Sequence, residues 1–137
     1  MNRLEVFARD AFRCVYCGTV QDVETLSVDH VQPRVRGGDG SGGNVVTACV
    51  ACNMIKASRP LAQFLAENPA ARRNFFLYAR YVWARHLKAV AEELVRRGVV
   101  ERPKDFVEGI QGLHGSEAIA QQLHKKLVAI AKPTTQN

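Results

Sequence analysis

The chain has 137 residues and a mass of 15.2 kDa, with 47% hydrophobic and 23% charged residues. This length allows one ordinary domain, or a small metal-bound module with a helical extension, and excludes two large independent cores. The composition is close to that of globular proteins and argues against a disordered or fibrous chain. A formal net charge of +6 indicates a polyanionic partner without saying which one.

Targeting and membrane signals are weak throughout the chain. The N-terminus has no apolar run of signal-peptide length, and no stretch approaches the roughly 18 apolar residues of a membrane span. We therefore expect a cytoplasmic protein without a membrane partner. In that reducing compartment, four cysteines are more often metal ligands than disulfides.

The first 60 residues contain short predicted elements. Apolar residues at helical spacing predict a helix over residues 4–12. Strands are predicted over residues 26–31 and 44–48, with a proline- and glycine-rich loop between them. A short helix is expected from residue 49 to about 58.

From residue 61 the pattern becomes helical. A helix over 61–67 is followed by Asn68 and Pro69, which suit the N-cap and first turn of a long helix ending near Gly98. Ser116 is expected to cap a last helix. The apolar stripe of the long helix consists of Phe76, Ala79, Trp83, Leu87, Val90 and Leu94. Its first turns are apolar nearly all round, so the first module, the last helix or a second subunit of a homodimer must cover them.

These signals predict an N-terminal module over residues 1–60, a helical extension over 61–132 and a frayed tail over 133–137. The basic charge is unevenly divided between the two halves. Residues 1–60 hold seven Lys and Arg against six Asp and Glu, whereas residues 61–137 hold twelve against seven. We therefore expect the helical half to supply much of the attraction to phosphate groups.

All four cysteines lie in two Cys-x-x-Cys pairs, Cys14–Cys17 and Cys49–Cys52, which are separated by 31 residues. Two such pairs are typical of a closed, structural, four-thiolate zinc site. The alternative is a redox function or coincidence. A redox function is disfavoured because it does not require two pairs on either side of a strand, loop and strand.

Sequence around and between the cysteine pairs resembles the zinc-binding branch of the His-Asn-His (HNH) endonucleases. The matching segments are Arg9–Gly18, Leu26–Pro33, Gly37–Gly38, Gly43–Val46 and Ala48–Lys56, and they lie within residues 9–60, about two fifths of the chain. The resemblance implies an α+β fold, in which a ββα-metal module held by the four-cysteine zinc site precedes an all-helical C-terminal extension. It also implies metal-dependent hydrolysis of phosphodiester bonds in nucleic acid, most often double-stranded DNA.

The resemblance assigns roles to four polar residues. His30 would be the general base that activates water. Asp29 and Asn53 would bind the catalytic divalent ion, and Asn44 would orient the imidazole of His30 and hold its loop. Asn53 stands where the family name has its last histidine, and its neutral oxygen favours a hard ion such as Mg²⁺ or Mn²⁺.

Geometry adds two expectations about these residues. Neighbours in a regular strand point to opposite faces, so the strand should end or bulge where Asp29 and His30 meet one site. Lys56 follows Asn53 by three residues on the predicted helix and is expected to meet a phosphate.

Arg34 and Arg36 lie in the loop after the first strand and are expected to contact the nucleic-acid backbone. Two rival functions remain open at this stage. One is a zinc-containing nucleic-acid-binding protein without catalysis, and the other is a ribonuclease or toxin-like nuclease with the same site.

Overall fold

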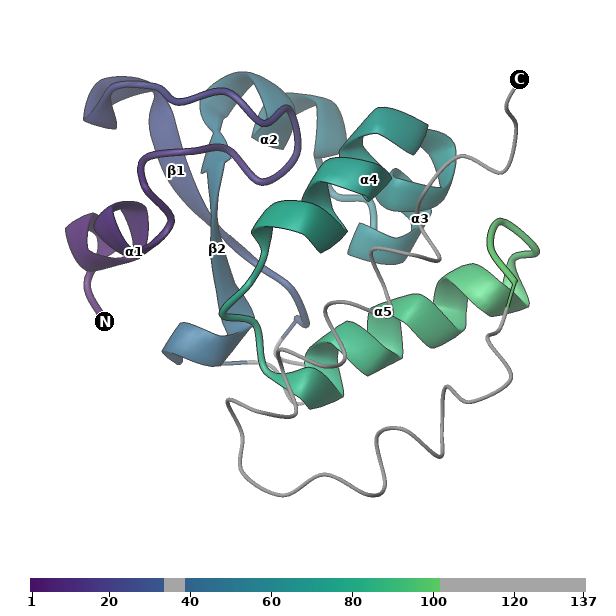
Figure 1. Cartoon of the computed structure of the whole chain (residues 1–137). Coiled ribbons are helices and arrows are strands. Elements are labelled where there is room, and N and C mark those ends of the chain that lie inside the picture. Colours follow the sequence, from purple (N-terminus) through teal and green to yellow (C-terminus); the bar gives the residue numbers. More distant parts are fainter. Residues whose placement is uncertain (34–38, 102–137) are drawn as a thin grey trace.

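The computed structural model describes residues 1–33 and 39–101. In chain order its elements are α1 (Arg3–Arg9), η1 (Val23–Thr25), β1 (Leu26–His30), η3 (Gly42–Asn44), β2 (Val45–Cys49), α2 (Val50–Lys56), α3 (Leu61–Glu67), α4 (Pro69–Tyr78) and α5 (Ala84–Arg96) (Figure 1). The predicted α+β class is confirmed, with two antiparallel strands followed by a helix. The helix expected from Ser116, and Arg34 and Arg36, lie outside the described residues. No helix in the described ranges is long and apolar enough to span a membrane.

The β1–β2 hairpin is the centre of the N-terminal module. Its register pairs Leu26 with Cys49 at one end and His30 with Val45 at the other. Helices α1 and α2 both contact the two strands, and all five residues of β2 are buried. A strand covered by helices in this way is mostly apolar, unlike a half-exposed strand that alternates, and its one polar residue, Thr47, is hydrogen-bonded.

The end of α1 differs from the prediction. The helix ends at Arg9 rather than continuing to residue 12, because Ala11 and Phe12 adopt positive φ angles of 58° and 57°. Asp10, just before them, accepts hydrogen bonds through Oδ2 from the Thr47 backbone nitrogen at 3.0 Å and the Thr47 hydroxyl at 2.9 Å. The side chain of Asp10 thus joins the end of α1 to β2, a tertiary link that periodicity alone does not predict.

Arg9 strengthens the same junction. Its guanidinium forms an ion pair with Asp10 at 3.0 Å and donates to the backbone oxygens of Gly42 at 2.7 Å and Val45 at 2.8 Å. The guanidinium therefore holds the segment that leads into β2. Both charged groups of this largely buried pair therefore have further hydrogen-bond partners, which offset the cost of burying them.

The predicted long helix after Pro69 is wrong, because the chain forms two helices. α4 ends at Tyr78, Ala79 leaves the helical region at φ −81° and ψ 60°, and α5 begins only at Ala84. Between them the Trp83 backbone nitrogen donates to the Gly43 oxygen at 2.8 Å. This bond to the N-terminal module replaces a bond within a continuous helix.

Asn68 is at the N-cap position of α4, with Pro69 in the first turn, as predicted. Its side chain makes no capping bond, because its amide donates to the Phe64 oxygen at 2.8 Å at the end of α3. The predicted apolar stripe is buried except for Trp83, which is 38% exposed.

The apolar start of α4 is covered in part by the N-terminal module, whereas Leu77 is 41% exposed. The Phe75 ring stacks on that of Tyr16 with centroids 6.1 Å apart, and both side chains are buried. One continuous cluster of buried apolar residues extends from Phe7 to Leu94. The division of the chain at residue 60 remains a prediction, since both sides share this core.

Candidate metal cage and nuclease site

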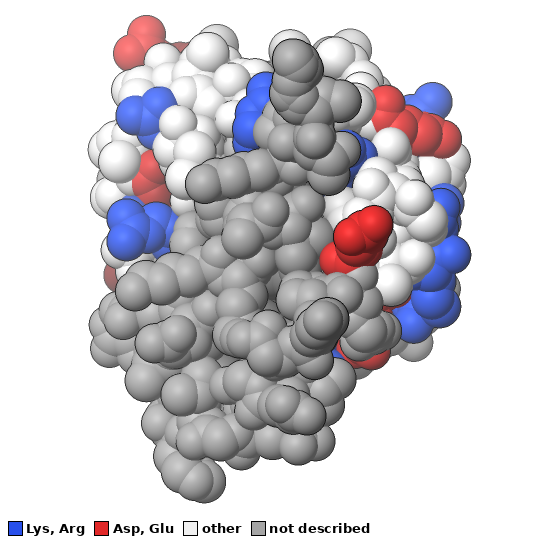
Figure 2. Space-filling model, turned by 45° about the vertical axis from the view of Figure 1, so that its right-hand side comes forward, with Lys and Arg blue, Asp and Glu red and all other residues white. Residues whose placement is uncertain are grey.

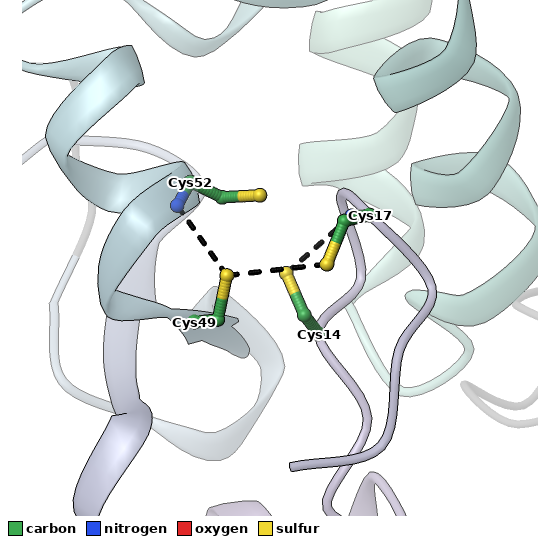
Figure 3. A group of neighbouring side chains, drawn as sticks. All are labelled: Cys14, Cys17, Cys49 and Cys52. Atoms are coloured by element: carbon green, nitrogen blue, oxygen red, sulfur yellow. Dashed lines mark hydrogen bonds between the residues drawn. The ribbon is translucent and has the colours of Figure 1, made fainter.

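The four cysteines form a cluster, called here the cysteine cage. Cys14 and Cys17 lie in the turn after α1, Cys49 ends β2, and Cys52 lies in the first turn of α2. Figure 3 shows their side chains turned toward one another, and all four sulfurs lie within 4.8 Å of each other. Zinc–sulfur bonds of about 2.3 Å in a tetrahedron place sulfurs about 3.8 Å apart. The cage therefore fits a tetrahedral ion after a small contraction.

Backbone N–H groups point at the cage sulfurs. The Tyr16 nitrogen lies 3.4 Å and the Cys17 nitrogen 3.5 Å from the sulfur of Cys14. Each Cys-x-x-Cys turn is called a knuckle here. In the second knuckle, Cys49–Cys52, the Cys52 nitrogen donates to the sulfur of Cys49 at 3.3 Å. These bonds stabilise negative sulfur, so the local backbone prepares both knuckles to hold thiolates.

Burial and hydrogen bonds shift the pKa values of three thiols of the cysteine cage in different directions. Burial raises the pKa of Cys14, and burial together with the charge of Cys14 raises the pKa of Cys52. For Cys17, burial opposes ionisation, yet hydrogen bonds led by that with Thr19 lower the pKa to about 7. A cation held by the four sulfurs would offset this burial, and a closed set of four sulfurs leaves no ligand position for a substrate.

The predicted acidic ligand lies near the end of β1. Asp29 accepts hydrogen bonds at both carboxylate oxygens, from the Lys56 ammonium to Oδ1 at 3.1 Å and from the Tyr16 hydroxyl to Oδ2 at 2.5 Å. Burial, followed by the charge of Asp29, raises the pKa of Tyr16 well above its ordinary value, so the hydroxyl keeps its proton. The next residue, His30, is exposed and is the last residue of β1. The strand thus ends at His30, one residue before its predicted end, and Asp29 and His30 are both paired with β2.

Asn53 faces the same side of β1 as Asp29. Its amide nitrogen donates to the Ser27 hydroxyl at 2.6 Å, and Ser27 precedes Asp29 by two strand positions, which places both on one face. On α2, Asn53 and Lys56 are three residues apart and share the face toward β1. Asp29 and Asn53 thus offer hard oxygen donors from facing elements, which suits an ion such as Mg²⁺ or Mn²⁺.

Asn44 holds the loop after β1. Its buried amide donates to the backbone oxygens of Gln32 at 2.9 Å and Asp39 at 2.8 Å, and its oxygen accepts from the Gln32 nitrogen at 2.8 Å. Its backbone oxygen also accepts from Val31 at 2.8 Å. The amide hydrogens are directed to loop backbone, so orientation of the His30 ring by Asn44 remains a prediction.

A cavity of about 730 Å³ opens beside Asp29 and His30. The cavity is also lined by α5, which contributes Glu93, Arg96 and Arg97. The Glu93 carboxylate binds Arg96 at 2.8 Å and Arg97 at 3.0 Å. The helical half therefore borders the cavity beside the predicted catalytic residues, all of which lie in the first half of the chain.

Tyr16 has no role predicted from the sequence. It lies between the cysteines of the first pair, where the pattern shows only a knuckle residue. Lys56 was singled out for phosphate, yet its side chain is buried and paired with Asp29. No sequence pattern signals either contact, because the partner residue is 13 or more positions away.

Parts of this chain resemble known proteins. Residues 14–59 match the family model for HNH endonuclease. The chain is also 34% identical over 61 residues to the CRISPR-associated endonuclease Cas9 of Actinomyces naeslundii, a stretch covering 44% of this chain and 6% of that protein. The crystal structure of the Type II-C Cas9 enzyme from the same species aligns with 92% of this chain and 11% of its own, at a TM-score of 0.44 and 23% identity.

Residues 14–59 therefore form an HNH endonuclease domain. This segment contains the cysteine cage as well as Asp29, His30, Asn44 and Asn53. The chain spans only a small fraction of the curated relative that it matches.

Proposed function

We propose that the chain is a metal-dependent endonuclease that hydrolyses phosphodiester bonds in DNA. The observation that carries the proposal is the placement of Asp29 and Asn53 on facing sides of β1 and α2, beside an exposed His30. A pair of oxygen ligands and an exposed imidazole next to a cavity are what metal-assisted hydrolysis requires. The family match of residues 14–59 supports the same reaction class.

Each residue has one task in the proposed reaction. The imidazole of His30 takes a proton from a water molecule, whose oxygen then attacks the phosphorus. The bond to the 3′ oxygen breaks, leaving a 5′ phosphate on one fragment and, after protonation by solvent, a 3′ hydroxyl on the other. A divalent ion at Asp29 and Asn53 would supply Lewis acidity for the phosphate and the leaving oxygen. Asn44 holds the loop that follows His30.

The cysteine cage has a separate, structural task in this proposal. Zinc is the ion that best suits four thiolates in two Cys-x-x-Cys pairs. The cage joins the turn after α1 to the start of α2. It thereby keeps α2, which carries Asn53, in place against β1.

Binding of the substrate is proposed to use the helical half. Figure 2 shows basic and acidic side chains interspersed on the described part of one face, with basic groups gathered along its right-hand edge. Arg96 and Arg97 border the cavity beside the nuclease site. Arg34 and Arg36 are further candidates for backbone contact.

A plasmid assay tests the enzyme against the non-catalytic rival. Supercoiled DNA is incubated with the wild type and with His30→Ala in Mg²⁺ or Mn²⁺, and binding is measured separately by gel shift. We expect nicked or linear product with the wild type alone. Intact plasmid with both metals, together with tight binding, would show a nucleic-acid-binding protein instead. Structured and single-stranded RNA in the same assay test the ribonuclease rival.

Oligomeric state decides how both strands are cut. One active site severs one strand, so double-strand cleavage needs either a homodimer or two encounters. Sedimentation velocity of the full chain, alone and with a DNA duplex, distinguishes these two routes.

A further inference from the structure

The side chain and backbone of Tyr16 contact three parts of the molecule. The hydroxyl donates to Asp29 Oδ2 at 2.5 Å, in the nuclease site. The backbone nitrogen lies 3.4 Å from the Cys14 sulfur, in the cysteine cage. The backbone oxygen accepts from the Asn74 amide of α4 at 2.8 Å. A single residue therefore connects the cage, the helical half and the nuclease site.

Packing fixes the direction of this side chain. The ring is 1% exposed and lies between Phe64, edge-on at 5.3 Å, and Phe75, stacked at 6.1 Å. A close-packed ring with both backbone groups bonded has little freedom to move. The Tyr16 hydroxyl is therefore a rigid donor, and it sets the position of Asp29 Oδ2.

The other carboxylate oxygen has a different kind of partner. Oδ1 of Asp29 faces the Lys56 ammonium at 3.1 Å, and lysine carries its charge on a flexible four-carbon chain. Oδ1 thus has a movable partner, whereas Oδ2 has a fixed one. A second cation approaching Asp29 meets least resistance at Oδ1, where the ammonium can move aside.

We infer that Tyr16 is a positioning residue for the divalent-ion site: by holding Asp29 through Oδ2, it presents Oδ1 to the ion in place of Lys56, and it makes ion binding depend on the cysteine cage. This inference rests on the proposed function, which makes Asp29 an ion ligand. Hydrogen-bond partners that orient a metal ligand typically contribute 10- to 100-fold in metal affinity or activity.

The test is Tyr16→Phe in the full, zinc-loaded chain. The substitution keeps the ring between Phe64 and Phe75 and both backbone contacts, and removes only the hydroxyl. We expect the Kd for Mn²⁺ at the nuclease site, measured by electron paramagnetic resonance, to rise roughly 10- to 100-fold. Zinc content and circular dichroism should stay as in the wild type. Asp29→Asn identifies which part of the Mn²⁺ signal belongs to this site.

The dependence of DNA nicking on Mg²⁺ concentration gives a second readout. We expect the half-saturating Mg²⁺ concentration to rise by a similar factor in Tyr16→Phe, while the rate at saturating Mg²⁺ stays close to that of the wild type. Tyr81→Phe removes a hydroxyl from an exposed tyrosine and should change neither quantity.

Two results would overturn the inference. One is wild-type Mn²⁺ affinity in a folded Tyr16→Phe variant. The other is a lower maximal rate at an unchanged Mg²⁺ midpoint, which indicates a merely structural role. Failure of the proposed function gives a different pattern: the wild type cuts no nucleic acid, while Tyr16→Phe still weakens Mn²⁺ binding.

Discussion

The Lys56 ammonium lies 3.1 Å from Asp29 Oδ1, and the two side chains are only 10% and 13% exposed. The Lys56 ammonium neutralises the carboxylate charge of Asp29 within the protein. Any divalent ion or phosphate that uses these residues must therefore exchange with an existing interaction. This contact joins α2 to β1. It explains why Lys56, a charged residue at the end of a short helix, is buried.

Replacing Lys56 with methionine should expose the dependence of Asp29 on a cation. The variant keeps the length of the side chain but leaves a largely buried carboxylate without its ion-pair partner, which costs about 3 to 5 kcal/mol of folding stability. We expect thermal denaturation to show a lower Tm without divalent ions and a larger rise in Tm with Mn²⁺ than in the wild type. Lys88→Met, on α5, serves as the control. Equal Mn²⁺ responses in all three proteins would contradict the role of Lys56 as counterion.

Removal of the proposed base should abolish activity without affecting the fold. His30 is exposed at the end of β1, so His30→Ala removes few packing contacts. We expect a loss of nicking rate of roughly 100-fold or more, with an unchanged circular dichroism spectrum. Nicking at the wild-type rate would show that another group activates the water.

Loss of a ligand of the cysteine cage should disrupt the fold, unlike the loss of His30. Cys14 is fully buried and its sulfur accepts two backbone hydrogen bonds. Because small zinc modules owe their folding energy to the bound ion, Cys14→Ser or a strong chelator should release zinc and unfold the N-terminal module. Zinc analysis and circular dichroism measure both effects. If Cys14→Ser proves as well folded as His30→Ala, this division of tasks is wrong.

The loop held by Asn44 should depend on its amide. Asn44→Ala leaves the Gln32 nitrogen and the Asp39 oxygen without their partner, at a cost of about 1 to 3 kcal/mol in unfolding free energy. We expect both a lower denaturant midpoint and slower nicking, because His30 lies just before this loop. A stable variant with full activity would argue that the loop needs no such anchor.

The contact that separates α4 from α5 can be tested at Gly43. A Cβ atom on this residue would lie 2.1 Å from the Trp83 ring, so the ring must move. This movement should disturb the hydrogen bond from the Trp83 backbone nitrogen to the Gly43 oxygen. We expect Gly43→Ala to lower the unfolding free energy by about 1 to 3 kcal/mol. Gly40→Ala is the matched control, since nothing lies within 4 Å of its added Cβ. Equal stability of the two variants would contradict the tight approach.

Local patterns in the sequence determined the two Cys-x-x-Cys turns, the β1–β2–α2 order and the span of α3, because each depends on residues close together in the chain. The meeting of the two cysteine pairs, which are 31 residues apart, followed instead from the four ligands that a closed zinc site needs. β1 ends at His30, one residue before its predicted end.

Tertiary contacts decided the rest. The bond from Trp83 to Gly43 divides the predicted long helix, the Asn68 amide turns back to α3, and Lys56 turns inward to Asp29. Tyr16 acquires its contact with Asp29 only when the first knuckle packs against β1. Periodicity records which face of an element is apolar, whereas the partner of a buried polar group is fixed only once distant segments meet.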